Sequence, residues 1–324
     1  MLDVDTFLTT LYVLVDEECK AQQAAQTPAA SLRSWPPGRP PGRPPKLTPS
    51  EVITLGLFAQ WRFFGSERAF YRYAQRHLRA AFPTLPNRSQ YNRLLRRQYA
   101  GLIAIAWRVA ARLGAATCLY QVLDTTGVPT RQYKRRACGW LPSAAGIGYC
   151  NRVGWFEGLR LLTCATAEGV LTGFGLGEAP RKDQPLADAF LTARALPSAE
   201  TTTRLPCVGQ WYGGYYAVDT GFEGRALLQH WAEDLEALVV CMPNRSRPSG
   251  WPKRLRQWFA GVRQIAETVH ARLMDTFGLT TDRPHSLEGF QVRLAAKLAL
   301  YNCCCWFNQQ AGRPLLAFAD LLDW

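Results

Sequence analysis

Acidic residues are scarce in this sequence, where 25 Asp and Glu stand against 38 Lys and Arg and leave a formal net charge of +13. Lysine is scarcer still, because only six of the 38 basic residues are Lys and 32 are Arg. A GC-rich genome would explain part of that preference for Arg, but not the net charge. Such an excess favours a polyanionic partner, with nucleic acid first and an anionic membrane surface second.

Long apolar runs and paired cysteines are also missing. No stretch approaches 18 uninterrupted apolar residues, so no transmembrane helix is expected, and residues 1–5 are acidic where a secretory signal would be basic. The ten Cys contain no C-x-x-C pair, and the run at 303–305 lies in an apolar stretch typical of small core residues. We therefore expect no zinc site, and a reduced, cytoplasmic protein associated with the nucleoid.

The first 115 residues are predicted to form an all-α region. Apolar spacing, a capping box at 48–51 and further cap residues predict helices over 3–24, 49–63, 67–82, and from 87 or 89 to 114. Between Arg62 and Arg97 there are nine Arg and one acid, Glu67. Arginines at helical spacing on three short helices favour a helix-turn-helix-like DNA-binding region over a merely solvated bundle face.

A Pro/Arg-rich linker at 33–47 precedes those helices. It contains Gly-Arg-Pro twice, and proline keeps such a segment extended. Arg39, Arg43 and Lys46 could therefore contact a narrow minor groove. A stiff linker without DNA contact is the alternative, and the two interpretations are compatible.

The pattern changes after residue 116 to short apolar runs separated by helical segments. Strands are predicted at 118–123, 158–165, 170–176, 215–218 and 235–242, and helices at 183–195, 222–233, 253–277 and 286–310. This order is typical of an α/β domain with a mixed sheet flanked by helices. We place that domain at 116–280, with a basic insertion at 243–256, followed by a C-terminal helix and tail at 281–324.

Three carboxylates are the candidate catalytic residues. Asp124 and Asp219 each follow a predicted strand, where α/β sheets place their active sites. Glu267 lies on a predicted helix, in a stripe with Arg256, Arg263, His270 and Met274 that avoids the apolar positions. Converging carboxylates bind two Mg²⁺ ions in enzymes that cut phosphodiesters. A strand-end cap for each Asp, and a surface charge or an Arg263 partner for Glu267, are the alternatives.

These motifs resemble those of the DDE transposases of bacterial insertion sequences. The resemblance is carried by Val-Leu-Asp-Thr-Thr at 122–126, Ala-Val-Asp-Thr-Gly-Phe at 217–222, Arg-Gln-Ile-Ala-Glu-Thr at 263–268, Gly-Arg-Pro-Pro-Lys-Leu-Thr at 42–48, and Arg283 before an apolar helix. It implies an RNase H-like catalytic domain in which Asp124, Asp219 and Glu267 hold two Mg²⁺, with Mn²⁺ able to substitute. It also implies binding of terminal inverted repeats and target DNA, by a homodimer that cleaves the element's ends and joins them to the target.

Basic residues and one Trp are the candidate DNA contacts: Arg39, Arg43, Lys46, Arg72, Arg76, Arg88, Arg93, Arg96, Arg97, Lys134, Arg135, Arg136, Arg245, Arg247, Trp251, Lys253, Arg254, Arg256 and Arg263. Two departures from the family concern the stripe around Glu267. Ala260 and Met274 occupy positions where many relatives carry Tyr and Lys, so Arg272 or His270 would have to replace the Lys at the DNA end. Another RNase H-like nuclease, such as a junction resolvase, and a catalytically inactive DNA-binding derivative are the alternative functions.

Overall fold

The computed structural model describes residues 1–25, 45–134, 141, 143–195, 205–209, 214–242, 250–283 and 285–323. Most of the expected linker and half of the expected basic insertion lie outside the described residues. The same holds for six candidate DNA contacts, namely Arg39, Arg43, Arg135, Arg136, Arg245 and Arg247.

A seven-stranded mixed sheet forms the centre of the larger part of the molecule. Its strands are β2 (Tyr120–Arg131), β3 (Gly146–Cys150), β4 (Gly154–Thr166), β5 (Leu171–Glu178), β6 (Cys207–Gly209), β7 (Tyr215–Val218) and β8 (Leu238–Cys241). The order is β6-β5-β4-β2-β7-β8, and β3 pairs with β4. β2 runs antiparallel to β4 and parallel to β7, and β7 runs parallel to β8. The predicted mixed α/β sheet is confirmed.

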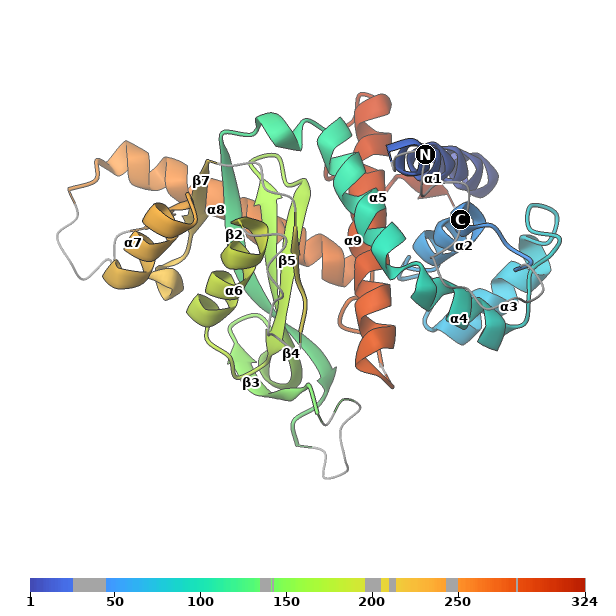
Figure 1. The fold of residues 1–324 in the computed structure, drawn as a ribbon, viewed down its shortest axis with the longest axis horizontal. Coiled ribbons are helices and arrows are strands. Elements are labelled where there is room, and N and C mark those ends of the chain that lie inside the picture. The colour runs from blue at the N-terminus through green and yellow to red at the C-terminus, as the bar shows by residue number, and fades with distance from the viewer. Residues whose placement is uncertain are drawn as a thin grey trace.

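Alternating side chains divide the sheet into two covered faces. Leu123 and Val218 pack with helices α6 (Asp183–Ala195) and α7 (Arg225–Asp234), whereas Val122 and Ala217 pack with α8 (Lys253–Asp275). Figure 1 shows α6 in front of the strands and α8 behind them. Because side chains alternate along a strand, residues two positions beyond Val122 and Ala217 also face α8.

The other described helices lie to one side of the sheet, next to β5. They are α1 (Val4–Ala25), α2 (Pro49–Phe58), α3 (Glu67–His77), α4 (Arg88–Arg97), α5 (Tyr99–Arg112) and α9 (Leu287–Gln310). Figure 1 shows α5 and α9 between the sheet and the other helices. One apolar cluster joins residues from α1 through α5 to the sheet and α9. The three Cys at 303–305 are buried in it, as predicted.

The two ends of the described chain lie side by side. β1 (Leu2–Asp3) pairs in parallel with β9 (Leu322–Asp323). Among the described residues, no helix combines the length and the apolar character that crossing a membrane requires.

Local signals explain where the front helices begin. Thr48 and Glu51 form the predicted capping box, in which the Thr48 hydroxyl accepts from the Glu51 amide at 3.2 Å and the Glu51 carboxylate accepts from the Thr48 amide at 2.6 Å. Ser66 and Asn87 cap α3 and α4. The helix ends were predicted less well, since α2 stops at Phe58 and α3 at His77.

The expected third front helix is two helices, because the chain turns at Gln98 between α4 and α5. No Gly or Pro marks that turn. α4 packs against α2, whereas α5 lies along α9, so tertiary packing rather than a local breaker sets the change in direction.

Candidate active site

The parallel pairing of β2 and β7 brings two of the three predicted carboxylates to one place. Val122 is in register with Ala217, and both face α8. Asp124 lies two residues after Val122, and Asp219 lies two residues after Ala217. Both Asp side chains therefore lie on the face of the sheet that α8 covers. Asp219 directly follows β7, as predicted.

Asp124 does not end its strand, contrary to the prediction. β2 continues to Arg131 because β4 pairs with it along this length, and Asp124 lies opposite Thr163. The end of the apolar run marks only an interruption in burial, at Asp124 and Thr125, since residues 126–128 of the same strand are buried again. Asp124 is thus held in the middle of a rigid central strand.

Burial dominates the electrostatics of Asp124 and raises its pKa to about 7. A hydrogen bond from the Thr125 amide, at 2.8 Å, and the charge of Arg263 act in the opposite direction. The neighbouring carboxylates of Asp219 and Asp183 add to the increase. A partly buried carboxyl with further acidic groups beside it has the setting in which a cation is most strongly attracted.

Arg263 of α8 already contributes a positive charge to this pair. Its guanidinium lies 3.1 Å from an Asp219 carboxylate oxygen. The other Asp219 oxygen accepts from the Thr220 amide at 2.6 Å, which caps the short 3₁₀ turn at Thr220–Phe222. Arg263 therefore offsets part of the negative charge of the two Asp side chains.

Glu267 is not brought to the pair. It lies one turn beyond Arg263 on α8 and is exposed, and it makes no hydrogen bond or ion pair with another described residue. Within the described ranges, no group of three or more His, Cys, Asp or Glu side chains is placed to hold a metal ion. Asp124 and Asp219 supply the hard oxygen donors that Mg²⁺ takes, but the expected third ligand is not gathered with them.

The C-terminal half of the expected polar stripe on α8 is buried. His270 and Met274 are 4% and 5% exposed, because this half of α8 packs against β4 and α9. The His270 ring lies 2.8 Å from the Thr163 hydroxyl, and burial lowers its pKa to about 3. The expectation that His270 replaces a DNA-contacting Lys is therefore wrong, since this imidazole is neutral and enclosed.

The apolar positions of α8 also differ from the prediction at one end. Leu255 is 40% exposed, whereas Phe259, Val262 and Ala266 pack on the sheet as predicted.

Asp183 was missed by the sequence analysis. The Thr125 hydroxyl donates to its carboxylate at 2.6 Å, and Arg160 of β4 pairs with it at 2.9 Å. A Cβ added at Gly221 would lie 3.1 Å from the other Asp183 oxygen. Asp183 thus accepts a hydrogen bond from Thr125, the residue after Asp124, and lies close to Gly221 in the turn after Asp219. Its place in the first turn of a predicted helix was visible in the sequence, but its partners were not.

The described candidate DNA contacts are mostly exposed. Those on the surface are Lys46, Arg72, Arg76, Arg88, Arg93, Arg96, Arg97, Lys134, Lys253, Arg254 and Arg256. Trp251 is only half-exposed and packs edge-on against Phe259 at 5.5 Å, whereas Trp258 is 52% exposed. Of the two rings, Trp258 is therefore the one available to stack on a base.

Comparison with known proteins adds nothing to this geometry. No protein-family model matches the chain, and searches of curated proteins and of solved structures gave no match.

Proposed function

We propose that this protein is a DDE-type transposase that binds the terminal repeats of its element, cleaves the DNA there and joins the freed ends to target DNA. The observation that carries the proposal is the placement of Asp124 and Asp219 side by side on the α8 face of a mixed sheet. α8, which packs over that face, also carries Arg263 and Glu267. The net charge of +13 supports a DNA substrate.

The sheet supports an RNase H-like domain. Its order β5-β4-β2-β7-β8 places an antiparallel group on one side of the central strand and two parallel strands on the other. An RNase H-like sheet has this arrangement, with its first Asp on the central strand. Asp124 occupies such a position on β2.

Asp124 and Asp219 are the residues that would hold Mg²⁺ in this proposal, with Glu267 completing the set. Bound there, Mg²⁺ polarises the scissile phosphate and stabilises the attacking and leaving oxygens. Because Arg263 already pairs with Asp219, a cation competes with it for this carboxylate. If a cation displaced it from Asp219, the Arg263 guanidinium would be free to pair with a phosphate of the DNA end.

The front helices would supply DNA recognition. α3 and α4 present seven exposed arginines, at positions 68, 72, 76, 88, 93, 96 and 97, and two such helices support a helix-turn-helix-like reader. Holding two ends requires a second copy, so the active form is proposed to be a homodimer acting on nucleoid DNA in the cytoplasm.

A catalytically inactive DNA-binding derivative is the second candidate. It is favoured by the position of Glu267, which stands exposed and apart from Asp124 and Asp219, and by the ion pair that Arg263 makes with Asp219. Such a protein would bind the ends and ignore Mg²⁺.

The two candidates are separated by cleavage of supercoiled plasmid carrying the DNA that flanks the gene, with and without Mg²⁺. A transposase nicks that DNA only with metal, and single Ala substitutions of Asp124, Asp219 or Glu267 abolish nicking while DNA binding persists. Near-normal cleavage by Glu267→Ala would exclude it as the third carboxylate and make Glu223 and Glu288 the next residues to test. Absence of nicking by the unsubstituted protein supports the inactive derivative.

A further inference from the structure

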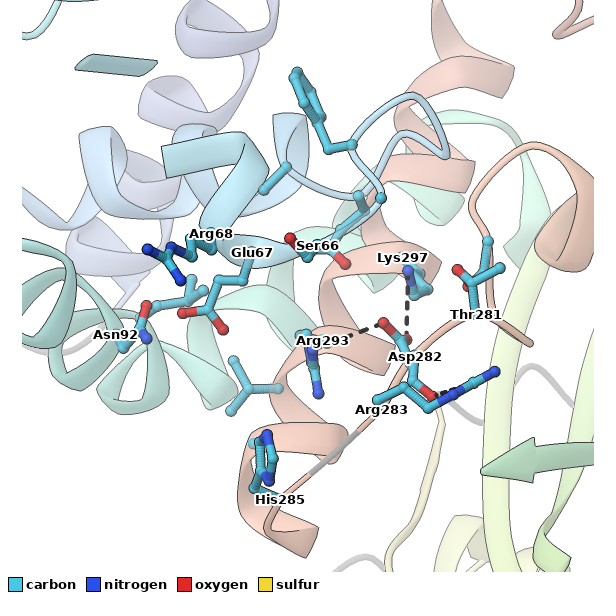
Figure 2. A pocket seen from close by; sticks show the side chains of 18 of the residues that line it. Ser66, Glu67, Arg68, Asn92, Thr281, Asp282, Arg283, His285, Arg293 and Lys297 are labelled. Atoms are coloured by element: carbon cyan, nitrogen blue, oxygen red, sulfur yellow. Dashed lines mark hydrogen bonds and ion pairs between the residues drawn. The ribbon is translucent and has the colours of Figure 1, made fainter. Parts of the chain in front are cut away.

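A cavity of about 480 Å³ lies where the front helices meet the C-terminal helix. Figure 2 shows Ser66, Glu67 and Arg68 at the start of α3 on one side of the cavity. Facing them are Arg293 and Lys297 on the first half of α9 and Asp282 in the segment before it. Phe277 and Gly278, just past the end of α8, also line it. The cavity is therefore built from segments far apart in the sequence, and it adjoins the helix that carries Arg263.

The cavity is strongly basic. Seven Arg and Lys side chains line it against Glu67 and Asp282, namely Arg62, Arg68, Arg88, Arg96, Arg283, Arg293 and Lys297. Asp282 is already neutralised, since Arg293 and Lys297 lie 3.8 and 3.5 Å from its carboxylate. The side chains of Arg68, Arg88 and Arg96 are exposed and make no hydrogen bond or ion pair with any described residue. Their charges remain available to an anion.

Helix α9 adds to the positive potential. This 24-residue helix begins at the cavity, where Ser286 caps it by accepting from the Gly289 amide at 3.2 Å. The Arg96 guanidinium reaches the same turn, because a Cβ added at Gly289 would lie 4.0 Å from it. A helix N-terminus with an arginine beside it attracts a phosphate.

A buried hydroxyl without a partner points independently to a ligand. Tyr91 lines the cavity and is 1% exposed, and its hydroxyl has no hydrogen-bond partner in the described part of the chain. Burial raises the pKa of Tyr91, so its oxygen keeps a proton to donate. A buried donor left unsatisfied costs free energy that an accepting ligand restores. A phosphate oxygen is such an acceptor, and the surrounding arginines match its charge.

We propose that this cavity binds a backbone phosphate of the DNA, with the adjoining sugar, through Arg88, Arg96 and the Tyr91 hydroxyl. The inference rests on the proposed function only in taking DNA, rather than free phosphate, as the source of that group. Bound there, one DNA strand is held by α4 and α9 together. The helices α3 and α4 and the end of α8, the helix that carries Arg263, would then lie against the same DNA strand.

Tyr91→Phe is the sharpest test, because it removes one oxygen that has no partner among the described residues. Its thermal transition is expected to be unchanged or raised. Binding of the full-length protein to a fluorescent mixed-sequence duplex in EDTA should weaken about tenfold, the effect of losing one hydrogen bond to a charged group. Arg96→Gln should weaken it similarly and reduce the slope of log affinity against log salt by about 0.9.

Arg225→Gln is the matched control, since Arg225 is exposed on α7, outside the proposed DNA-binding helices, and does not line the cavity. Duplex affinity unchanged by Tyr91→Phe and Arg96→Gln would overturn the inference. If inorganic phosphate raised the thermal transition only when both residues are intact, while duplex affinity stayed constant, the cavity would be a free-phosphate site and its assignment to DNA would be wrong. These measurements exclude metal, so failure of Mg²⁺-dependent cleavage refutes the proposed function without affecting them.

Discussion

Replacing Asp124 by Asn should make the metal-free protein more stable at alkaline pH. The raised pKa of Asp124 means that the folded protein keeps a proton that the unfolded chain releases between its ordinary value of 3.8 and about 7. Stability from this carboxyl therefore falls as pH rises through that window and stays low above it. Asp124→Asn removes the charge, and the amide oxygen can still accept from the Thr125 amide.

The expected gain in stability from Asp124→Asn follows from the raised pKa of Asp124. An increase from 3.8 to about 7 corresponds to roughly 4 kcal/mol for a fully enclosed carboxyl. Because the side chain is partly exposed, water screens the charge and we expect about 2 kcal/mol at pH 8. For 324 residues, an unfolding entropy of roughly 2 cal/mol/K per residue converts this to about 3 °C.

Thermal unfolding in EDTA at pH 5 and pH 8 measures the difference. Asp124→Asn should raise the midpoint of thermal unfolding by about 3 °C at pH 8 and by about 1 °C at pH 5. At pH 5 only about a third of the free-energy cost of ionising Asp124 in the folded protein applies. Asp320→Asn, at an exposed carboxylate outside the central sheet, controls for the loss of one negative charge. A lower transition at pH 8 would refute the reasoning, because the ionised carboxylate would then stabilise the fold through Arg263.

Three further substitutions test the neighbouring contacts. Met274→Lys places an ammonium in the core and should lower the free energy of unfolding in denaturant by roughly 3 kcal/mol. Met274→Leu should be tolerated. An unchanged denaturation midpoint for Met274→Lys would show that residue 274 faces solvent with the polar stripe of α8. Arg263→Ala should lower stability by less than about 1 kcal/mol, since its ion pair is partly exposed, yet strongly reduce strand transfer; normal joining would limit Arg263 to a structural role. Asp183→Asn leaves Arg160 without its carboxylate and should cost roughly 2 kcal/mol; a variant as stable as the parent protein would show that this ion pair between β4 and α6 does not stabilise the fold.

The elements with strong local signals were predicted closely. The helix at Asp183–Ala195 and the strand at Tyr215–Val218 have the bounds that the sequence indicated, and Gly169 turns the predicted hairpin with a φ of +88°. The helix caps at Thr48, Ser66 and Asn87 could be predicted from the sequence, because each side chain accepts a hydrogen bond from a backbone amide only three residues away.

Features that depend on distant partners were not predictable. β2 extends past Asp124 because β4 pairs with it, and β3 forms as an added strand on β4. His270 and Met274 looked polar-facing in a helical projection, yet β4 and α9 cover them. Asp183 joins the site through Thr125 and Arg160, at 58 and 23 residues' separation, and no local pattern encodes such contacts.

The central claim is that Asp124, Asp219 and Glu267 act together on DNA with Mg²⁺. Its most direct test is the joining of a pre-cleaved duplex, carrying the sequence that flanks the gene and a free 3′-OH, to a supercoiled target plasmid. We expect joined product with Mg²⁺ or Mn²⁺ and none in EDTA, and loss of product in Asp124→Ala, Asp219→Ala and Glu267→Ala proteins that still bind the duplex. Mg²⁺-dependent nicking without joining would identify a nuclease instead, and duplex binding with neither activity would contradict the claim.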